Sequence, residues 1–251
     1  MNYNNITIRN ILGIPEIKSG DDISQIILQA LKKNRITLKD KDVLVITQKI
    51  ISKAENRLVH KDLIKPTTRA IKLSKKINKN PLLTQLILNE SKRIIQKKSG
   101  VIITETHHGF ICANSGIDQS NVPLDYYCLL PLNPDNSAKN IRLIFEKEFN
   151  IKIGVIISDT FGRPFRSGQT DVAIGVSGID PLLNYKGSTD YYKKNINVTS
   201  IAIADELASS AELVLGKTNH SPIALIRGYD FKFSTKNSKL LIMPKNKSLF
   251  S

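Results

Sequence analysis

The chain has 251 residues, 41% of them hydrophobic, and its 37 basic against 22 acidic residues give a formal net charge of +15. A chain of this length and composition buries a core without disulfide bonds. Its two cysteines, Cys112 and Cys128, form no CxxC pair, which suits a reducing compartment and predicts a cytoplasmic protein. Charged or amide side chains interrupt every apolar run before the roughly 20 residues that cross a bilayer, so we predict no membrane segment.

The positive charge allows two interpretations. It would suit a polyanion such as nucleic acid, but the lysines are spread along the chain among isoleucines and asparagines and do not form one basic arm. Aromatic base-stacking motifs, zinc-finger spacings and tryptophan are absent from the sequence. We therefore interpret the charge as solvated helix faces and keep nucleic-acid binding as the rival hypothesis.

Strands and helices alternate irregularly along the chain. The apolar patterning predicts strands over 5–11, 42–47, 101–104, 109–113, 151–157 and 221–228. Helices are predicted over 21–34, 48–56, 65–78, 81–98, 135–149 and 202–216. Because strands come both singly and in adjacent pairs, the pattern favours an α+β fold over a doubly wound parallel sheet.

The stretch 158–175, SDTFGRPFRSGQTDVAIG, concentrates acids, arginines, glycines and hydroxyls after an apolar run. Such a run ending in Ser-Asp-Thr predicts a buried strand whose carboxyl end carries an acid and a hydroxyl, where loops often carry chemistry. Asp159 and Thr160 offer the oxygen ligands that Mg²⁺ or Mn²⁺ prefers. Arg163 and Arg166, three apart, are spaced to face one phosphate. The alternative is a surface turn in which Asp159 caps and Arg163 pairs with a neighbour.

Two further segments are weaker signals when taken singly. The loop 113–121, ANSGIDQSN, offers Asp118 and Asn121, although an isolated loop of this composition is usually only a turn. In VITQKIISKAEN, Gln48 and Lys53 follow a strand, where a lysine can neutralise phosphate, but the segment is not a Walker loop. The histidines and cysteines show no zinc-ligand spacing and GxSxG is absent, which argues against zinc-dependent and serine hydrolases.

In order and in wording, these segments closely resemble the coenzyme F420-0:γ-glutamyl ligase family. The matching segments are GIPEIKSGDDI, VLVITQKIISKAENRLV, CANSGIDQSNV, SDTFGRPFRSGQTDVAIGVSGIDPLLNYKGSTDYY, and AIADELASSAELVLGK followed by PIALIRG. The resemblance runs from about Gly13 to Gly228, to the stand-alone form without the nitroreductase-like extension of some bacterial relatives. It implies a homodimer in which one domain, 1–251, comprises two intimately packed α+β subdomains with mixed and antiparallel sheets.

The resemblance also implies a reaction. Family members add L-glutamate to the lactyl carboxylate of the deazaflavin precursor F420-0, and then further glutamates through γ-linkages. GTP is the co-substrate, Mg²⁺ or Mn²⁺ is required, and a monovalent cation such as K⁺ often assists. The substrate carboxylate is activated as an acyl phosphate, which the amine of glutamate then attacks. A ligase of the same chemistry that acts on a different acid is the nearer alternative.

By position, the resemblance implies a nucleotide-binding set and a metal-binding set. The nucleotide-binding set is Ile14, Pro15, Glu16, Ile17, Gln48, Lys53, Asn121 and Lys217. Asp118 and Asp159 match the acids that hold one divalent ion, and Thr160 matches a position at a second ion. Arg163 and Arg166 are our own addition as phosphate clamps, so they join Asp118 and Asp159 in the catalytic set.

One position departs from part of the family. Lys217 stands where some archaeal relatives carry an acid that contributes to the second metal and the nucleotide, and bacterial relatives show a similar lysine. We therefore expect the second ion to be held differently here, or by the nucleotide alone.

Overall fold

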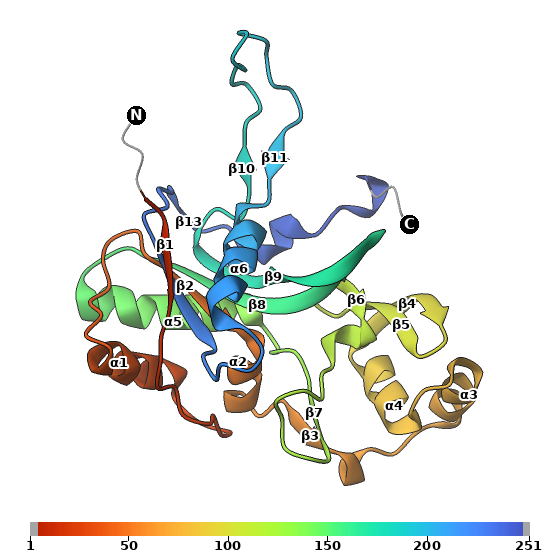
Figure 1. The fold of residues 1–251 in the computed structure, drawn as a ribbon. Helices are drawn as coiled ribbons and strands as arrows, with labels where there is room; N and C mark the ends of the chain where they lie inside the picture. The colour runs from red at the N-terminus through yellow and green to blue at the C-terminus, as the bar shows by residue number, and fades with distance from the viewer. Residues whose placement is uncertain (1–4, 248–251) are drawn as a thin grey trace.

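A six-stranded mixed sheet is the centre of the larger part of the molecule, in a computed structural model that describes residues 5–247 (Figure 1). Its strands are β1 (Thr7–Asn10), β2 (Val43–Thr47), β8 (Gly154–Arg163), β9 (Arg166–Ile179), β12 (Ile223–Arg227) and β13 (Phe233–Ser234). The strand order is β1-β12-β2-β8-β9-β13. β2 and β8 are parallel, and the other neighbouring pairs are antiparallel.

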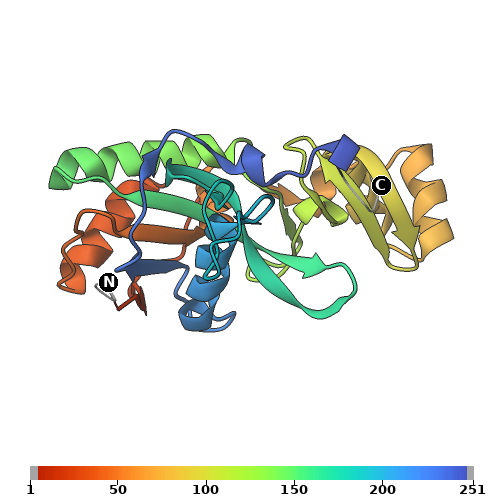
Figure 2. The same ribbon diagram turned by 90° about the horizontal axis from the view of Figure 1, so that it is seen from above.

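Helices cover both faces of this sheet (Figure 2). They are α1 (Ile23–Lys33), α2 (Gln48–Ala54), α5 (Pro134–Phe149) and α6 (Ile203–Leu215). Side chains of α1, α2 and α5 share one hydrophobic core with the sheet, and those of α6 share the other. The apolar stripe of each helix is thereby buried against the strands.

Successive residues of the central strands face the two cores in turn. Leu44 and Ile157 pack in the core of α1 and α5, whereas Val45 and Ile156 pack in the core of α6. Because side chains alternate along a strand, the polar residues that follow Ile157 in β8 are divided between the same two faces.

A smaller part of the molecule lies beside the large sheet (Figures 1 and 2). It contains α3 (Thr68–Ile77), α4 (Pro81–Asn89) and an antiparallel sheet of β4 (Ser91–Lys98), β5 (Val101–Thr106) and β6 (Ile111–Ala113). Its own core includes the buried side chains of Ile77, Ile87 and Ile102.

Two short strand pairs complete the fold. β3 (Leu58–His60) pairs with β7 (Tyr126–Cys128), and β10 (Leu183–Asn184) pairs with β11 (Ser200–Ile201) at the base of a projecting arm (Figure 1). The 3₁₀ turns are η1 (Lys61–Leu63), η2 (Asn114–Gly116), η3 (Ser238–Leu241) and η4 (Lys245–Lys247). The predicted α+β class with mixed and antiparallel sheets is confirmed, while the grouping of 1–251 into one domain stays a prediction. No helix in the described part of the chain is long and apolar enough to cross a membrane.

The helix predicted over 81–98 is wrong in its second half. α4 ends at Asn89, and Ser91–Lys98 is the strand β4, which pairs with β5. Ile94 and Ile95 are β-branched and favour a strand once a partner is available. The lysines and arginine of β4 then lie on an edge strand, where charge is common, so the basic run that suggested a helix surface belongs to a sheet edge.

The strand predicted over 151–157 continues to Arg163 as β8, and the chain returns as β9. The two strands form a long hairpin whose register shifts between Ile157 and Ser158, where Ile157 pairs with Gly175 and Ser158 pairs with Ala173. Such a bulge leaves an extra residue on one strand and turns the following side chains. Asp159 and Thr160 therefore lie inside a strand, on opposite faces, and not in a loop at its end.

Candidate functional site

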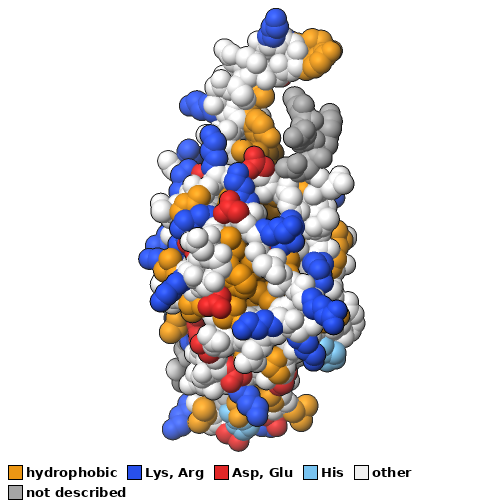
Figure 3. All heavy atoms as spheres, turned by 90° about the vertical axis from the view of Figure 1, so that its left-hand side faces the viewer, with side chains coloured by type: hydrophobic (Ala, Val, Ile, Leu, Met, Phe, Trp, Pro, Cys, Tyr) orange, Lys and Arg blue, Asp and Glu red, His pale blue; other side chains and the backbone are white. Residues whose placement is uncertain are grey.

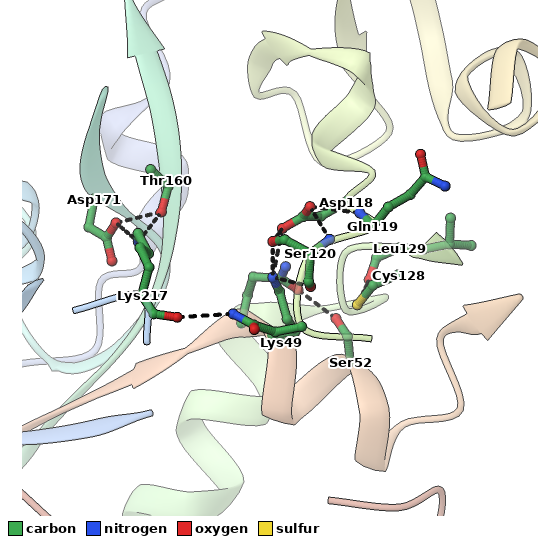
Figure 4. A network of polar contacts seen from close by, with 12 residues as sticks. Lys49, Ser52, Asp118, Gln119, Ser120, Cys128, Leu129, Thr160, Asp171 and Lys217 are labelled. Carbon is green, nitrogen blue, oxygen red and sulfur yellow. Dashed lines mark hydrogen bonds and ion pairs between the residues drawn. The ribbon is translucent and has the colours of Figure 1, made fainter. Parts of the chain in front are cut away.

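Figure 4 shows two polar clusters, one of Thr160, Asp171 and Lys217 at the β8–β9 hairpin and the other of Lys49, Asp118 and Ser120 at a neighbouring loop. Asp159 follows Ile157 on the face of α1 and α5, whereas Ser158 and Thr160 follow Ile156 on the face of α6. The predicted metal ligands Asp159 and Thr160 are therefore adjacent in sequence but have different neighbours.

The first cluster centres on Asp118, in the loop after η2. The backbone of Asp118 bridges Cys128, and its Oδ2 accepts hydrogen bonds from Lys49 Nζ at 2.6 Å and Ser120 Oγ at 2.7 Å. Its Oδ1 accepts from the backbone amides of Gln119 and Ser120. Burial raises the pKa of Asp118, but hydrogen bonds from Lys49 and Ser120 outweigh burial and hold that pKa below its ordinary value. Asp118 is thus an ionised carboxylate held by a lysine.

Asp159 lies near this cluster without a cation of its own. Burial raises its pKa to about 7, and repulsion from the carboxylates of Asp171 and Asp118 adds to the rise, whereas the backbone amide of Thr160 and the positive charge of Lys49 oppose it. Among the described residues, no lysine or arginine forms an ion pair with Asp159. The structure therefore brings Asp118 and Asp159 into one electrostatic environment in which negative charge is under-compensated.

The second cluster joins β8, β9 and α6. Thr160 and Asp171 are cross-strand partners, and Thr160 Oγ1 donates to Asp171 Oδ1 at 2.7 Å. Ser158 Oγ donates to the other carboxylate oxygen at 3.2 Å. Lys217 Nζ donates to Thr160 Oγ1 at 2.7 Å and lies 3.2 Å from Asp171 Oδ1. Lys217 is thus the ion-pair partner of a buried carboxylate.

One hydrogen bond links the two clusters. The side-chain amide of Asn121, three residues after Asp118, donates to the backbone carbonyl of Lys217 at 3.3 Å. The loop that carries Asp118 and the segment after α6 therefore meet at the hairpin (Figure 4). Three predicted positions, Asp118, Asn121 and Lys217, are brought together although 99 residues separate the first from the last.

The predicted nucleotide-binding turn lies against α2. Glu16 Oε1 pairs with Lys53 Nζ at 2.5 Å, and Lys53 is buried while Glu16 is exposed. Ile17 is buried and Ile14 packs on the main core, which fixes the turn, and Pro15 is exposed.

Gln48, at the start of α2, is buried, and one of its two side-chain polar atoms has a hydrogen-bond partner in the described part of the chain. Its Oε1 accepts a hydrogen bond from Ser52 Oγ at 2.7 Å, whereas its Nε2 has no hydrogen-bond partner in the described part of the molecule. Buried amide donors are normally paired, so this one is suited to an acceptor on a bound molecule.

The structure does not bring Arg163 and Arg166 to the carboxylates. The two arginines are cross-strand partners at the tip of the hairpin, and both are exposed. The side chain of Arg163 donates to the backbone carbonyl of Ser167 at 2.9 Å. Arg163 is four residues beyond Asp159, a distance of about 13 Å along a strand. The assignment of these arginines as phosphate clamps stays a prediction.

Sequence reasoning missed two charged members of the clusters. Lys49 is an ordinary lysine on a helix by composition, and only the position of Asp118 in space reveals its partner. Asp171 was visible as the second acid of the 158–175 stretch. Reading GRPFR as a hairpin turn would have placed Asp171 near Thr160, although a second register shift, between Gly162 and Arg163, changes the pairing that a regular hairpin predicts.

The two clusters differ in how they fit a metal ion. Within residues 5–247, no three histidine, cysteine or acidic side chains are grouped to hold one. Asp118 and Asp159 fit a single Mg²⁺ or Mn²⁺: Asp159 forms no ion pair in the described part of the chain, and although Lys49 holds the Oδ2 of Asp118, the Oδ1 of Asp118 accepts from backbone amides, so water or phosphate can complete six ligands. The hydroxyl of Thr160 does not fit a second ion, because it already accepts from Lys217.

Comparisons with known proteins show the family of this chain. The family model described as F420-0:Gamma-glutamyl ligase matches residues 12–228, most of the chain. The chain belongs to this family. It is 43% identical over 242 residues to the coenzyme F420:L-glutamate ligase of Methanocaldococcus jannaschii, covering 95% of this chain and 94% of the relative. The relative of the same name from Methanothermobacter thermautotrophicus is 40% identical over 248 residues, covering 98% of both chains.

A more divergent relative extends the same pattern. The coenzyme F420:L-glutamate ligase of Methanopyrus kandleri is 38% identical over 214 residues, 85% of this chain and 83% of the relative. The span matched by the F420-0:gamma-glutamyl ligase family includes both polar clusters and the turn at Glu16.

Proposed function

We propose that the protein is a GTP-dependent ligase of coenzyme F420 biosynthesis. It adds L-glutamate to F420-0, and then further γ-linked glutamates, and it acts as a homodimer. The proposal is carried by one observation: the family match spans a polar cluster in which Asp118 pairs with Lys49 and lies near enough to Asp159 to raise its pKa. The names of the relatives, each a coenzyme F420:L-glutamate ligase, supply the substrates.

The reaction would proceed in two displacements. A carboxylate oxygen of F420-0 attacks the γ-phosphorus of GTP, the bond to the β-phosphate oxygen breaks, and GDP leaves. The amine of glutamate then attacks the acyl carbon, the bond to the phosphate oxygen breaks, and the nitrogen loses a proton as the amide forms. The first displacement is needed because a carboxylate is a poor electrophile until it carries a leaving group.

Different residues of this chain would bind the metal ion and the nucleotide. Asp118 and Asp159 would hold one Mg²⁺ or Mn²⁺, which offsets negative charge on the phosphoryl group when bound. Lys53 would contact phosphate beside the turn at Glu16, and the unpaired Nε2 of Gln48 would donate to the nucleotide. Asn121 and Lys217 would border the nucleotide on the hairpin side.

The surface charge gives the nucleic-acid hypothesis little support. Figure 3 shows one face of the molecule, on which lysines and arginines are interspersed with acidic and hydrophobic side chains. A nucleic-acid site normally gathers basic residues into a patch or stripe. The charge on this face is therefore consistent with a solvated surface.

A direct assay tests the proposed function. Purified protein is incubated with GTP, Mg²⁺ or Mn²⁺, L-glutamate and F420-0, and the products are weighed by mass spectrometry. We expect F420-0 to gain one or more glutamyl residues with formation of GDP, and Asp159→Asn to abolish this product while its circular dichroism stays that of the wild type. Absence of glutamylated F420-0 with the wild type, or full turnover by Asp159→Asn, would count against the proposal.

A further inference from the structure

The ammonium group of Lys217 occupies an oxygen-lined position of the kind that binds cations. Its Nζ lies 2.7 Å from Thr160 Oγ1, 3.2 Å from Asp171 Oδ1 and 3.3 Å from Glu212 Oε1. These oxygens come from β8, β9 and α6, three separate elements. A lysine ammonium has three N–H donors and no acceptor, so the three oxygens match its whole donor capacity.

The buried carboxylate at this position already has a positive partner. Asp171 is only 2% exposed, and a buried carboxylate requires a positive partner or hydrogen bonds. Lys217 supplies the charge, and Ser158 and Thr160 supply neutral hydroxyl donors. The contrast is with Asp159 on the opposite face, which has carboxylates as neighbours and, within the described residues, no ion pair.

A metal ion and this ammonium cannot share the position. A divalent ion bound to Thr160 Oγ1 would sit about 2.1 Å from it, and the lysine nitrogen lies 2.7 Å from the same oxygen. Two positive groups at such separation repel strongly wherever water is partly excluded. Binding a second ion there would require Lys217 to leave, which would remove the ion-pair partner of Asp171.

The backbone holds Lys217 in this place. Lys217 follows Gly216, which ends α6 with a φ of 60°, and its carbonyl accepts the hydrogen bond from Asn121. Its side chain is nevertheless 56% exposed. The ammonium is therefore anchored on its protein side and open on the other, where a phosphate oxygen can approach.

We propose that Lys217 is a resident cation that takes the place of a second metal ion at Thr160 and Asp171. The site then takes one divalent ion per chain, the one held by Asp118 and Asp159, and the fixed ammonium supplies the remaining positive charge toward the phosphates. This rests on the proposed function, which provides the nucleotide and the first ion.

The test counts metal ions and does not depend on turnover. Mn²⁺ bound per chain is measured by equilibrium dialysis with a saturating non-hydrolysable GTP analogue, and a protein-free cell corrects for metal held by free nucleotide. We expect one Mn²⁺ for the wild type and two for Lys217→Glu, which replaces the ammonium with a carboxylate ligand. The matched control is Lys236→Glu, because Lys236 is 57% exposed and also paired with an aspartate, and it should bind one.

Two outcomes would overturn the proposal: a wild-type count other than one, or a count for folded Lys217→Glu equal to that of the wild type. The wild-type count decides the question even when the variant does not fold. Failure of the proposed function would be a separate result. A wild type that binds one Mn²⁺ but makes no glutamylated F420-0 would contradict the proposed function and would still agree with the proposed role of Lys217.

Discussion

At the scale of single residues, the three aspartates of the site differ in whether a positive side chain is paired with them. Asp118 and Asp171 each form an ion pair with a lysine, whereas Asp159 forms none within the described residues, and two nearby carboxylates raise its pKa against the opposing charge of Lys49. An acid in such surroundings is stabilised in its neutral form unless a cation is supplied. Asp159 is thus the residue at which the empty and the metal-loaded protein should differ most.

The raised pKa of Asp159 predicts a pH-dependent stability in the metal-free protein. Its folded-state pKa of about 7 lies above the ordinary 3.8, so the folded protein binds this proton more tightly than the unfolded chain does. The resulting stabilisation is fully present below about pH 4 and is lost as the pH rises through 7. Asp159→Asn lacks this titration.

Thermal unfolding in a chelator measures the effect. The melting temperature of the wild type minus that of Asp159→Asn should fall between pH 4 and pH 7 and stay level above pH 8. Adding Mn²⁺ at pH 8 should raise the melting temperature of the wild type more than that of the variant. A difference that does not change between pH 4 and 7 would show that Asp159 titrates as an ordinary aspartate.

Lys53 predicts a selective loss of nucleotide affinity. It is a buried residue of α2, and its ammonium pairs with the exposed Glu16. Because a hydrogen bond to a charged group is worth about 1.5–3 kcal/mol, Lys53→Ala should weaken GTP binding by about 10- to 140-fold. F420-0 binding should change less. Calorimetric titration of both ligands checks this, with Glu16→Gln as the variant that keeps the lysine, and equal losses for the two ligands would contradict a phosphate contact.

At the scale of elements, the hairpin of β8 and β9 positions the chemistry. Its bulge brings Thr160 opposite Asp171, and Gly175 beside the bulge lets the start of α5 approach closely. A Cβ at Gly175 would lie 2.4 Å from the backbone oxygen of Pro134. The close packing of α5 on β9 therefore depends on a glycine at this position.

Substitution of Gly175 should accordingly destabilise the fold. Gly175→Ala forces α5 and β9 apart, and overpacking of this kind costs about 1–3 kcal/mol of unfolding free energy. Gly162→Ala, in the same hairpin, is the control, because nothing lies within 4 Å of the Cβ that it would add. Urea denaturation followed by circular dichroism measures both, and equal midpoints for the two variants would refute the packing argument.

The elements also show what the sequence could and could not predict. Buried strands such as β2 and amphipathic helices such as α1 follow from periodicity alone, because their apolar side chains repeat at the spacing of the structure. β4 escaped prediction because its pairing with β5 decides its conformation. Asp118 and Asp159 were found through motif resemblance, and Asp171 could have been found by reading GRPFR as a hairpin turn, whereas Lys49 is recognisable only once the chain has brought distant segments together.

At the scale of the whole molecule, the predicted homodimer is open to a simple measurement. One chain has a mass of 28.0 kDa, so light scattering coupled to size-exclusion chromatography should give twice this value. The arm at β10 and β11 carries exposed apolar side chains, among them Tyr191 and Val198, as expected of a surface that meets a partner. A mass of one chain at micromolar concentration would refute the dimer.

The side chains of β8 alternate between the two faces of the sheet, so the apolar residues of this strand determine on which face its polar residues lie. The burial of Ile156 and Ile157 in the two cores fixes the orientation of the strand. Alternation then places Asp159 on the side of Ile157 and Thr160 on the side of Ile156. Removing a single residue between Ile157 and Asp159 would exchange every downstream side chain between the two sides of the sheet. This segment should consequently accept changes of residue type far more readily than any change of length.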